Sequence, residues 1–426
     1  MLNKNVVTRI HDKHYDLTNF NHPGGPIALS LADNRDATGL FISHHPFVAK
    51  DRLAAIMKKY EFTPKEGEEI EKDIYFDYEK ESPFAKEVVA NARQYFQRIA
   101  DKKGISITRA TKANTGRYME YLFLLVCYVV SMYYWFAGHW WAFFVWPFAL
   151  WELSIHSYHD ACHFAVTYNW RFNFLIPYIV APVLVSPLDW YHQHNIGHHV
   201  HTDIAWKDPD LAHAPKLYRV HKSIKWRAAH KDQVWKTPLI WAIGLPIGMA
   251  LVAPLRSMFT KLYNRTVPYV RISQSRWFLH VLGRVLAIAM WVWPYFYFNF
   301  WKALIWTPLA LYQMSAYFMC SSQVSHLTHA ATNMSSRDWH THQVLTSLGY
   351  GHKSWWVWFH SGGLNFQAEH HLFPNINHCH HKYLQPIVEA TCKKHGVRYL
   401  QAEGYIDALK MHFDHIINMG KNKVDQ

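Results

Sequence analysis

Residues 121–151 read YLFLLVCYVVSMYYWFAGHWWAFFVWPFALW, an almost continuous apolar stretch that is interrupted at Gly138-His139. Crossing the hydrocarbon core of a bilayer takes about 20 helical residues. Extended through Ser157, the stretch therefore predicts two short membrane-spanning helices in a tight hairpin. No Lys or Arg occurs between Arg117 and Arg171, a gap too long for the surface of a soluble protein. The sequence predicts an integral membrane protein.

Further apolar runs follow this hairpin. Residues 277–298 and 304–325 form a second predicted hairpin, with Lys302 near its turn. Two other runs, 172–188 and 239–255, contain prolines, which disrupt helix interiors. We expect these two runs to be interfacial or re-entrant segments. The predicted fold is an all-α membrane domain with four transmembrane helices in two hairpins, plus interfacial helices.

The distribution of charge predicts the topology. The formal net charge is +13, and most basic residues lie in regions that flank the apolar runs, 1–118, 190–236 and 326–426. This placement favours contact with anionic lipid head groups over nucleic acid binding. The positive-inside rule places all three regions in the cytosol, which four spans allow. The N-terminus lacks the apolar core of a signal peptide, so we expect internal spans to direct targeting.

Three histidine clusters adjoin the predicted cytosolic face. The first, His159-Asp-Ala-Cys-His163, follows the second span, and its i, i+4 spacing places both imidazoles on one helical face. The second cluster is HNIGHH at 194–199, and the third is QAEHH at 367–371. His326, at the end of the fourth apolar run, is a further candidate.

These clusters predict a metal site. Imidazole suits Fe, Zn, Cu and Ni, whereas the five cysteines are scattered without a CxxC pair, which argues against thiolate ligands. A structural zinc site needs only four ligands, so the larger histidine set indicates two metal ions. The candidate ligands are His159, His163, His194, His198, His199, His326, His370 and His371. Three histidines in a polar stretch after Pro374 are expected at the surface: His378, His380 and His381.

With these motifs, the chain resembles the membrane fatty acid desaturases, and specifically the front-end desaturases fused to cytochrome b5. The family's boxes have the forms HxxxH, HxxHH or HxxxHH, and QxxHH, and they occur here in order as HDACH, HNIGHH and QAEHH. The flanks SPLDWYHQHNIGHHVHTD, DPDL and SGGLNFQAEHHLFPNI also match. The resemblance covers nearly the whole chain, and the Gln that begins the third box is the front-end hallmark.

Residues 1–62 look like a shortened cytochrome b5 domain, a small α+β unit. The segments YDLT at 15–18, HPGG at 22–25, DAT at 36–38 and SHHP at 43–46 match its pattern. By this match His22 and His45 are the axial ligands of haem b, with His45 preferred to His44. A degenerate domain kept as a scaffold is the alternative. Residues 63–118 are expected to form a linker and an amphipathic surface helix from about Pro83 to Lys103, and 119–426 the desaturase domain.

The resemblance implies an O2-dependent acyl-chain desaturase with two non-haem iron ions in the endoplasmic reticulum membrane. Such an enzyme inserts a double bond between an existing double bond and the carboxyl end of a polyunsaturated chain, carried as acyl-CoA or acyl-phospholipid. NADH-cytochrome b5 reductase would supply electrons through the haem. Gln367 would hold a water on one iron. The HxxxHH form favours delta-5 chemistry, with delta-4 and delta-6 as alternatives.

Other functions remain open at this point. A sphingolipid delta-8 desaturase or an acyl hydroxylase could use the same ligands, because hydrogen abstraction followed by oxygen rebound gives an alcohol. A membrane-anchored electron carrier would need one span and no ligand boxes, so the intact boxes argue against it.

Overall fold

The computed structural model describes residues 6–180, 185–264, 266–270 and 273–421. It begins with a small α+β unit. Strands β1 (Val7–Ile10), β2 (Lys13–Asp16) and β3 (Glu61–Phe62) form an antiparallel sheet in the order β1-β2-β3, with Val7 opposite Asp16 and His14 opposite Phe62. Three short helices complete the unit: α1 (Gly25–Ala32), α2 (Thr38–His44) and α3 (Lys50–Met57). Its core contains Ile10, Tyr15, Leu17, Ala37 and Met57.

Helix α4 (Pro83–Lys103) has the boundaries that the sequence predicts. The side chain of Ser82 accepts a hydrogen bond from the backbone N–H of Ala85 at its start, and Gly104 ends it in the left-handed conformation with φ 61°. The apolar face of α4 packs against α21 (His381–His395), where Val88, Phe96 and Leu384 are fully buried. The linker helix is therefore attached to the third-box region of the chain.

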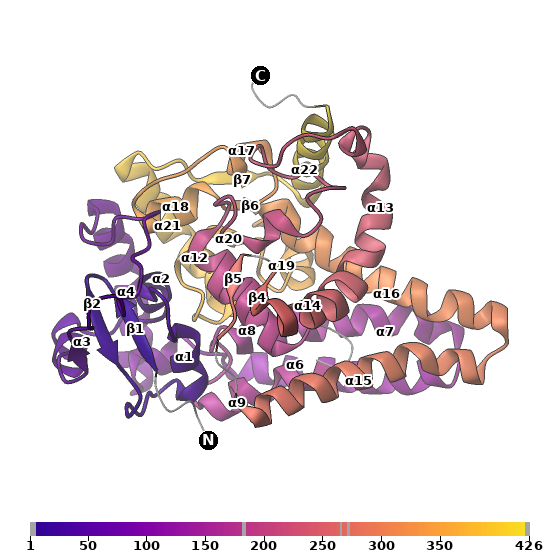
Figure 1. Cartoon of the computed structure of the whole chain (residues 1–426), viewed down its shortest axis with the longest axis horizontal. Coiled ribbons are helices and arrows are strands. Elements are labelled where there is room, and N and C mark those ends of the chain that lie inside the picture. The colour runs from indigo at the N-terminus through magenta and orange to yellow at the C-terminus, as the bar shows by residue number, and fades with distance from the viewer. Residues whose placement is uncertain (1–5, 181–184, 265, 271–272, 422–426) are drawn as a thin grey trace.

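Four long helices form the two predicted hairpins. Helices α6 (Thr115–Phe136) and α7 (Trp140–Leu153) make the first, and α15 (Gln274–Tyr297) and α16 (Phe300–Ser322) make the second. Figure 1 shows the four extending side by side away from the rest of the molecule. The two hairpin turns meet, because Lys302 Nζ donates a hydrogen bond to the carbonyl oxygen of Gly138 at 2.7 Å.

Within the described residues, three helices are long and apolar enough to cross a membrane: Thr115–Phe136, Gln233–Ser257 and Gln274–Tyr297. The first and third belong to the predicted hairpins. Their partners α7 and α16 fall outside this set, although both pack along the same bundle. Many side chains on α6 and α15 that face outward are large and apolar, as expected of helices in contact with lipid.

The second of these helices differs from the expectation of a proline-broken segment. Helix α13 (Gln233–Ile243), the π-helical η5 (Gly244–Val252) and α14 (Ala253–Thr260) follow one another without a break. The prolines are accommodated because Pro254 stands in the first turn of α14 and Pro246 lies in the π-helical stretch. Figure 1 shows α13 running across the direction of the four long helices, which agrees with an interfacial position.

The remaining elements form a compact cap over one end of the bundle. Parallel strands β6 (Leu348–Tyr350) and β7 (Leu400–Ala402) and the antiparallel pair β4 (Leu262–Tyr263) and β5 (Val267–Pro268) are its only strands within the described residues. The other cap elements are short helices, together with the longer α22: α5 (Ile107–Ala110), η1 (Ser154–Tyr158), α8 (His159–Cys162), α9 (Trp170–Leu175), α10 (Pro177–Val180), α11 (Pro187–Trp190), η2 (Tyr191–His198), α12 (His199–His201), η3 (Pro209–Ala212), η4 (Ala228–His230), η6 (Gln323–Ser325), α17 (His329–Thr332), α18 (Trp339–Leu345), α19 (Trp355–His360), α20 (Gln367–Leu372), η7 (His378–His380) and α22 (Tyr405–Gly420).

Candidate metal centre

Two π-helical segments deliver the first and second histidine boxes. The segment η1 extends α7 and leads directly into the first box, and η2 carries most of the second. A π-helical turn places residues five apart, rather than four apart, close together, and such turns are concentrated at functional sites. This spacing brings His194 Nε2 within 3.1 Å of His199 Nε2.

The first group of candidate ligands joins all three boxes. His159, His163, His194 and His370 are buried, and each offers a ring nitrogen within 4.8 Å of the others. The Nε2 atoms of His159 and His194 lie 3.0 Å apart. The group therefore has the size and the donor set of one metal site.

The second group adjoins the first. His198, His326 and His371 are buried together, and the Nε2 atoms of His198 and His326 lie 3.3 Å apart. Gln367 Nε2 lies 2.8 Å from His326 Nε2, which places the predicted catalytic amide beside this group. His199 lies between the groups, with its ring stacked on that of His371 at a centroid distance of 4.3 Å. All eight predicted ligands thus converge, seven in two groups and His199 between them.

Partners behind the rings fix their orientation. His198 Nδ1 lies 3.0 Å from Asp208 Oδ2, His371 Nδ1 lies 2.9 Å from Gln343 Oε1, and His326 Nδ1 lies 2.8 Å from the carbonyl oxygen of Thr346. These acceptors hold the proton on Nδ1 and leave Nε2 free to coordinate a metal. Asp208 and Gln343 were not among the predicted site residues. The DPDL segment that follows the second box was the available signal for Asp208.

Unsatisfied atoms at the centre of the cluster show that a metal fits. The buried Nε2 atoms of His163, His370 and His371 have no hydrogen-bond partner among the described residues. Buried polar atoms are normally satisfied, so three that point into one cluster indicate a missing ligand. Burial also lowers the pKa of His194 and His370 well below the ordinary value, which keeps both rings in the neutral form that binds metal.

The pKa of His198 is shifted in the opposite direction from those of His194 and His370. Burial alone would lower its pKa, but the charges of Asp208 and Asp210 and the hydrogen bond to Asp208 raise the pKa of His198 to about 9. The same carboxylates would offset the positive charge of a metal ion on the other side of the ring.

Gly197 lets the acidic segment approach His198. A Cβ atom on this glycine would lie 2.5 Å from Pro209 Cδ, closer than packed atoms allow. The absence of a side chain at Gly197 therefore permits η3 to pack on η2 and places Asp208 behind His198.

The expectation that His378, His380 and His381 are surface residues is wrong. Their exposed fractions are 1%, 8% and 1%. His378 Nδ1 lies 2.7 Å from Asp160 Oδ2, and the ring of His381 lies 5.7 Å from that of His370. The chain after Pro374 turns back beneath the first box, where His378 and His380 are buried with hydrogen-bond partners and His381 is buried beside His370.

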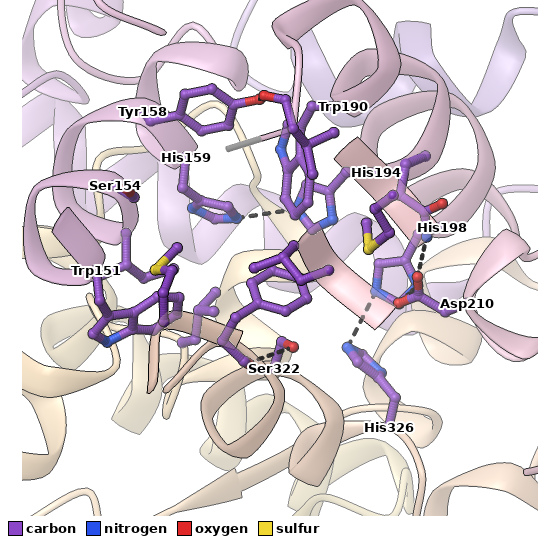
Figure 2. A pocket seen from close by; sticks show the side chains of 18 of the residues that line it. Trp151, Ser154, Tyr158, His159, Trp190, His194, His198, Asp210, Ser322 and His326 are labelled. Atoms are coloured by element: carbon purple, nitrogen blue, oxygen red, sulfur yellow. Dashed lines mark hydrogen bonds and ion pairs between the residues drawn. The ribbon is translucent and has the colours of Figure 1, made fainter. Parts of the chain in front are cut away.

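An apolar cavity ends at the metal centre. Figure 2 shows the ring of His159 facing that of His194 and the ring of His198 facing that of His326, with Trp151 and Tyr158 among the other lining residues. Trp190 stacks on His194 with a centroid distance of 4.6 Å. Most of the remaining lining is apolar: Ile155, Val185, Leu245, Met249, Met314, Phe318 and Leu364. A hydrocarbon chain fits such a lining, and Gln367 stands at its polar end.

The fatty acid desaturase family model matches residues 153–403, which include all eight converging histidines. The chain belongs to the fatty acid desaturase family. This desaturase also has full-length relatives. It is 29% identical to the acyl-lipid (8-3)-desaturase B of Dictyostelium discoideum, over 97% of this chain and 91% of that protein. It is 27% identical to the acyl-lipid (8-3)-desaturase of Mortierella alpina, over 96% and 93%. It is 26% identical to the delta(8)-fatty-acid desaturase 2 of Arabidopsis thaliana, over 92% and 84%.

The findings establish a front-end desaturase, an oxidoreductase and membrane protein with several apolar helices. Its α+β unit places the two candidate haem ligands opposite each other. The Nε2 atoms of His22 and His45 lie 3.4 Å apart, near the roughly 4 Å spanned by two metal–imidazole bonds of about 2 Å. His22 Nδ1 accepts a hydrogen bond from the N–H of Gly24, and His45 Nδ1 lies 2.8 Å from the carbonyl oxygen of Phe41. The ring of His44 lies against Phe164 and not against His22.

Proposed function

We propose that this desaturase inserts a cis double bond at the delta-5 position of long-chain polyunsaturated acyl chains that already carry a double bond farther from the carboxyl end. The apolar cavity that ends on both histidine groups is the observation that carries this proposal. The delta(5) names of two relatives from Dictyostelium discoideum favour delta-5 over delta-4 and delta-6.

We assign the two histidine groups to two iron ions, with His199 between them. When bound, the irons supply the O2 activation that removes hydrogen from an unactivated methylene pair. The reaction balances as one CH2–CH2 unit, one O2, two electrons and two protons giving one CH=CH unit and two waters. The protein contributes the positioning. Trp190 and Phe318 line the path of the chain, and Gln367 Oε1, which is buried without a partner in the described structure, can accept a hydrogen bond from water.

Product analysis tests the regiochemistry. In yeast that expresses the full chain and is fed single polyunsaturated acids, we expect gas chromatography to show a new delta-5 double bond in acids unsaturated at delta-8. Conversion of acids that lack the delta-8 bond into delta-8 products would instead support the activity named for the Arabidopsis relative. A hydroxylated product would assign the hydroxylase chemistry. Labelled phospholipid and CoA pools would identify the carrier, for which the acyl-lipid names of two relatives favour a lipid over CoA.

We further propose that the enzyme resides in the endoplasmic reticulum membrane with its metal cap and α+β unit in the cytosol. The unit would hold haem b through His22 and His45 and receive electrons from NADH-cytochrome b5 reductase. Three segments rich in Lys and Arg support this orientation. Two of them, 190–236 and 326–426, also contribute histidines to the same candidate metal centre.

Glycosylation mapping tests the orientation. The sequons Asn264-Arg-Thr266 and Asn333-Met-Ser335 both belong to the proposed cytosolic side, so we expect no mobility shift on glycosidase treatment. Asn264 is also engaged, because its Nδ2 donates a hydrogen bond to the carbonyl oxygen of Pro209 at 2.9 Å. A variant with a sequon-bearing insertion at the Gly138-His139 turn, which lies on the proposed lumenal side, is the positive control. Modification of native Asn264 would mean that residues 233–257 cross the membrane.

A further inference from the structure

The α+β unit is packed onto the desaturase domain through specific contacts. Asn375 Nδ2, three residues after the third-box helix α20, donates a hydrogen bond to the carbonyl oxygen of His44 at 2.8 Å. Arg276 Nη1 donates to Ser30 Oγ at 2.8 Å. Gly25, with φ +80°, lies so close to Trp170 that a Cβ atom would approach its ring to 2.4 Å. The candidate haem ligands are therefore held in a fixed position relative to the metal centre.

His44 lies at this junction. It directly precedes the candidate haem ligand His45, yet its ring turns toward the desaturase domain. Its ring lies edge-on to that of Phe164, with a centroid distance of 6.1 Å. The Nδ1 atom of His44 lies 3.1 Å from the carbonyl oxygen of Leu40, while its buried Nε2 has no hydrogen-bond partner among the described residues. The ring is thus buried at a position that hydrogen bonding alone does not explain.

Phe164 occupies the matching position on the other side. It directly follows the candidate iron ligand His163 and has a φ of 57°. A bulky residue in this left-handed region is uncommon and strained, and such residues cluster at functional sites. The conformation turns the Phe164 ring toward His44 and onto Tyr191, with which it stacks at a centroid distance of 6.3 Å.

We propose that His44 and Phe164 form the contact through which electrons cross from the haem to the metal centre. The proposal rests on the proposed function. The path follows the chain from His45 to His44, makes one non-covalent step to Phe164, and follows the chain again to His163. Each passage oxidises one ferrous haem to ferric and reduces one ferric ion of the metal centre to ferrous. Two passages serve one turnover, and an NADH-dependent reductase reduces the haem again.

Both side chains act as positioning residues in this account, because electron transfer slows steeply as the gap between donor and acceptor widens or loses packed atoms. His44→Ala opens the gap on the haem side. His44→Phe keeps an aromatic ring there and should restore most of the rate. Phe164→Gly removes the ring on the other side. Glycine is favoured at positive φ, which offsets part of the core packing that is lost with the ring.

Trp206→Gly is the matched control. Trp206 is also an aromatic residue at positive φ, with φ 64°, but its side chain is 58% exposed and lies outside the path. The Trp206→Gly variant therefore shows how far the exchange of a strained aromatic residue for glycine changes haem reoxidation when the residue lies outside the path. Iron content, the Soret maximum, the haem reduction potential and the rate of haem reduction by the reductase are measured for each variant.

Stopped-flow spectroscopy of the full-length protein tests the contact. The haem is reduced with NADH and reductase, then mixed with O2 and phosphatidylcholine vesicles that carry a delta-8-unsaturated acyl chain. We expect haem reoxidation to slow several-fold in His44→Ala and Phe164→Gly, with Soret maximum, potential and iron content unchanged, and to remain at the wild-type rate in Trp206→Gly. Wild-type reoxidation rates in both path variants would overturn the proposal, as would loss of the Soret band in His44→Ala. A wild-type protein without haem would instead contradict the function proposed for the α+β unit, and the contact with it.

Discussion

We expect His198→Ala to abolish desaturation while the protein still inserts into the membrane. His198 belongs to the second histidine group and is oriented by Asp208 at 3.0 Å. Loss of an orienting partner alone typically weakens metal binding or activity about 10–100-fold, and loss of the ligand itself should cost more. Product analysis in yeast gives the activity, and metal analysis of the purified variant gives the iron content.

His329→Ala is the control for this variant. His329 is an exposed histidine in α17, close in sequence to His326 but outside both groups. It should keep wild-type iron content and product yield. Substantial desaturation by His198→Ala at wild-type expression would contradict the assignment of His198 to a metal site.

The second large effect concerns the haem. We expect His22→Ala and His45→Ala each to eliminate the Soret band, because the two rings face each other and each supplies one of two axial positions. Product yield should fall to a small fraction of the wild-type value even when other cytochrome b5 is present, because the attached unit is held beside the metal centre.

His44→Ala is the control for these two variants, because the ring of His44 lies against Phe164 and not against His22. It should keep the Soret band. If His22→Ala retains full product yield, the attached unit does not supply the electrons, and a scaffold role for it would be the better interpretation.

The elements with strong local signals could be predicted from the sequence. The apolar runs located both hairpins, because lipid-facing helices are apolar on their outer surface. Ser82 and Gly104 bounded helix α4 through their capping chemistry. The three boxes identified the metal-binding face, because histidines in repeated clusters beside apolar runs are rare in other settings.

The structure of the cap could not be predicted in the same way, because it is formed by contacts between segments that are far apart in the sequence. No local pattern in the sequence indicates that η1 and η2 are π-helical, although the π-helical geometry of η2 brings His194 and His199 together. The burial of His378 escaped prediction for the same reason: its partner Asp160 is 218 residues away in the chain. A polar stretch usually lies at the surface, but here His378 and His380 are buried with hydrogen-bond partners, Asp160 Oδ2 and the carbonyl oxygen of Lys112.

We propose that this desaturase holds two iron ions in its histidine cluster. The most direct measurement is the number of iron atoms per chain in the purified full-length protein, with haem iron counted separately from the Soret absorbance. Two groups of buried imidazoles, with His199 between them, predict two non-haem irons per chain. A single non-haem iron, or zinc in place of iron in a preparation that still desaturates, would rule out a two-iron centre.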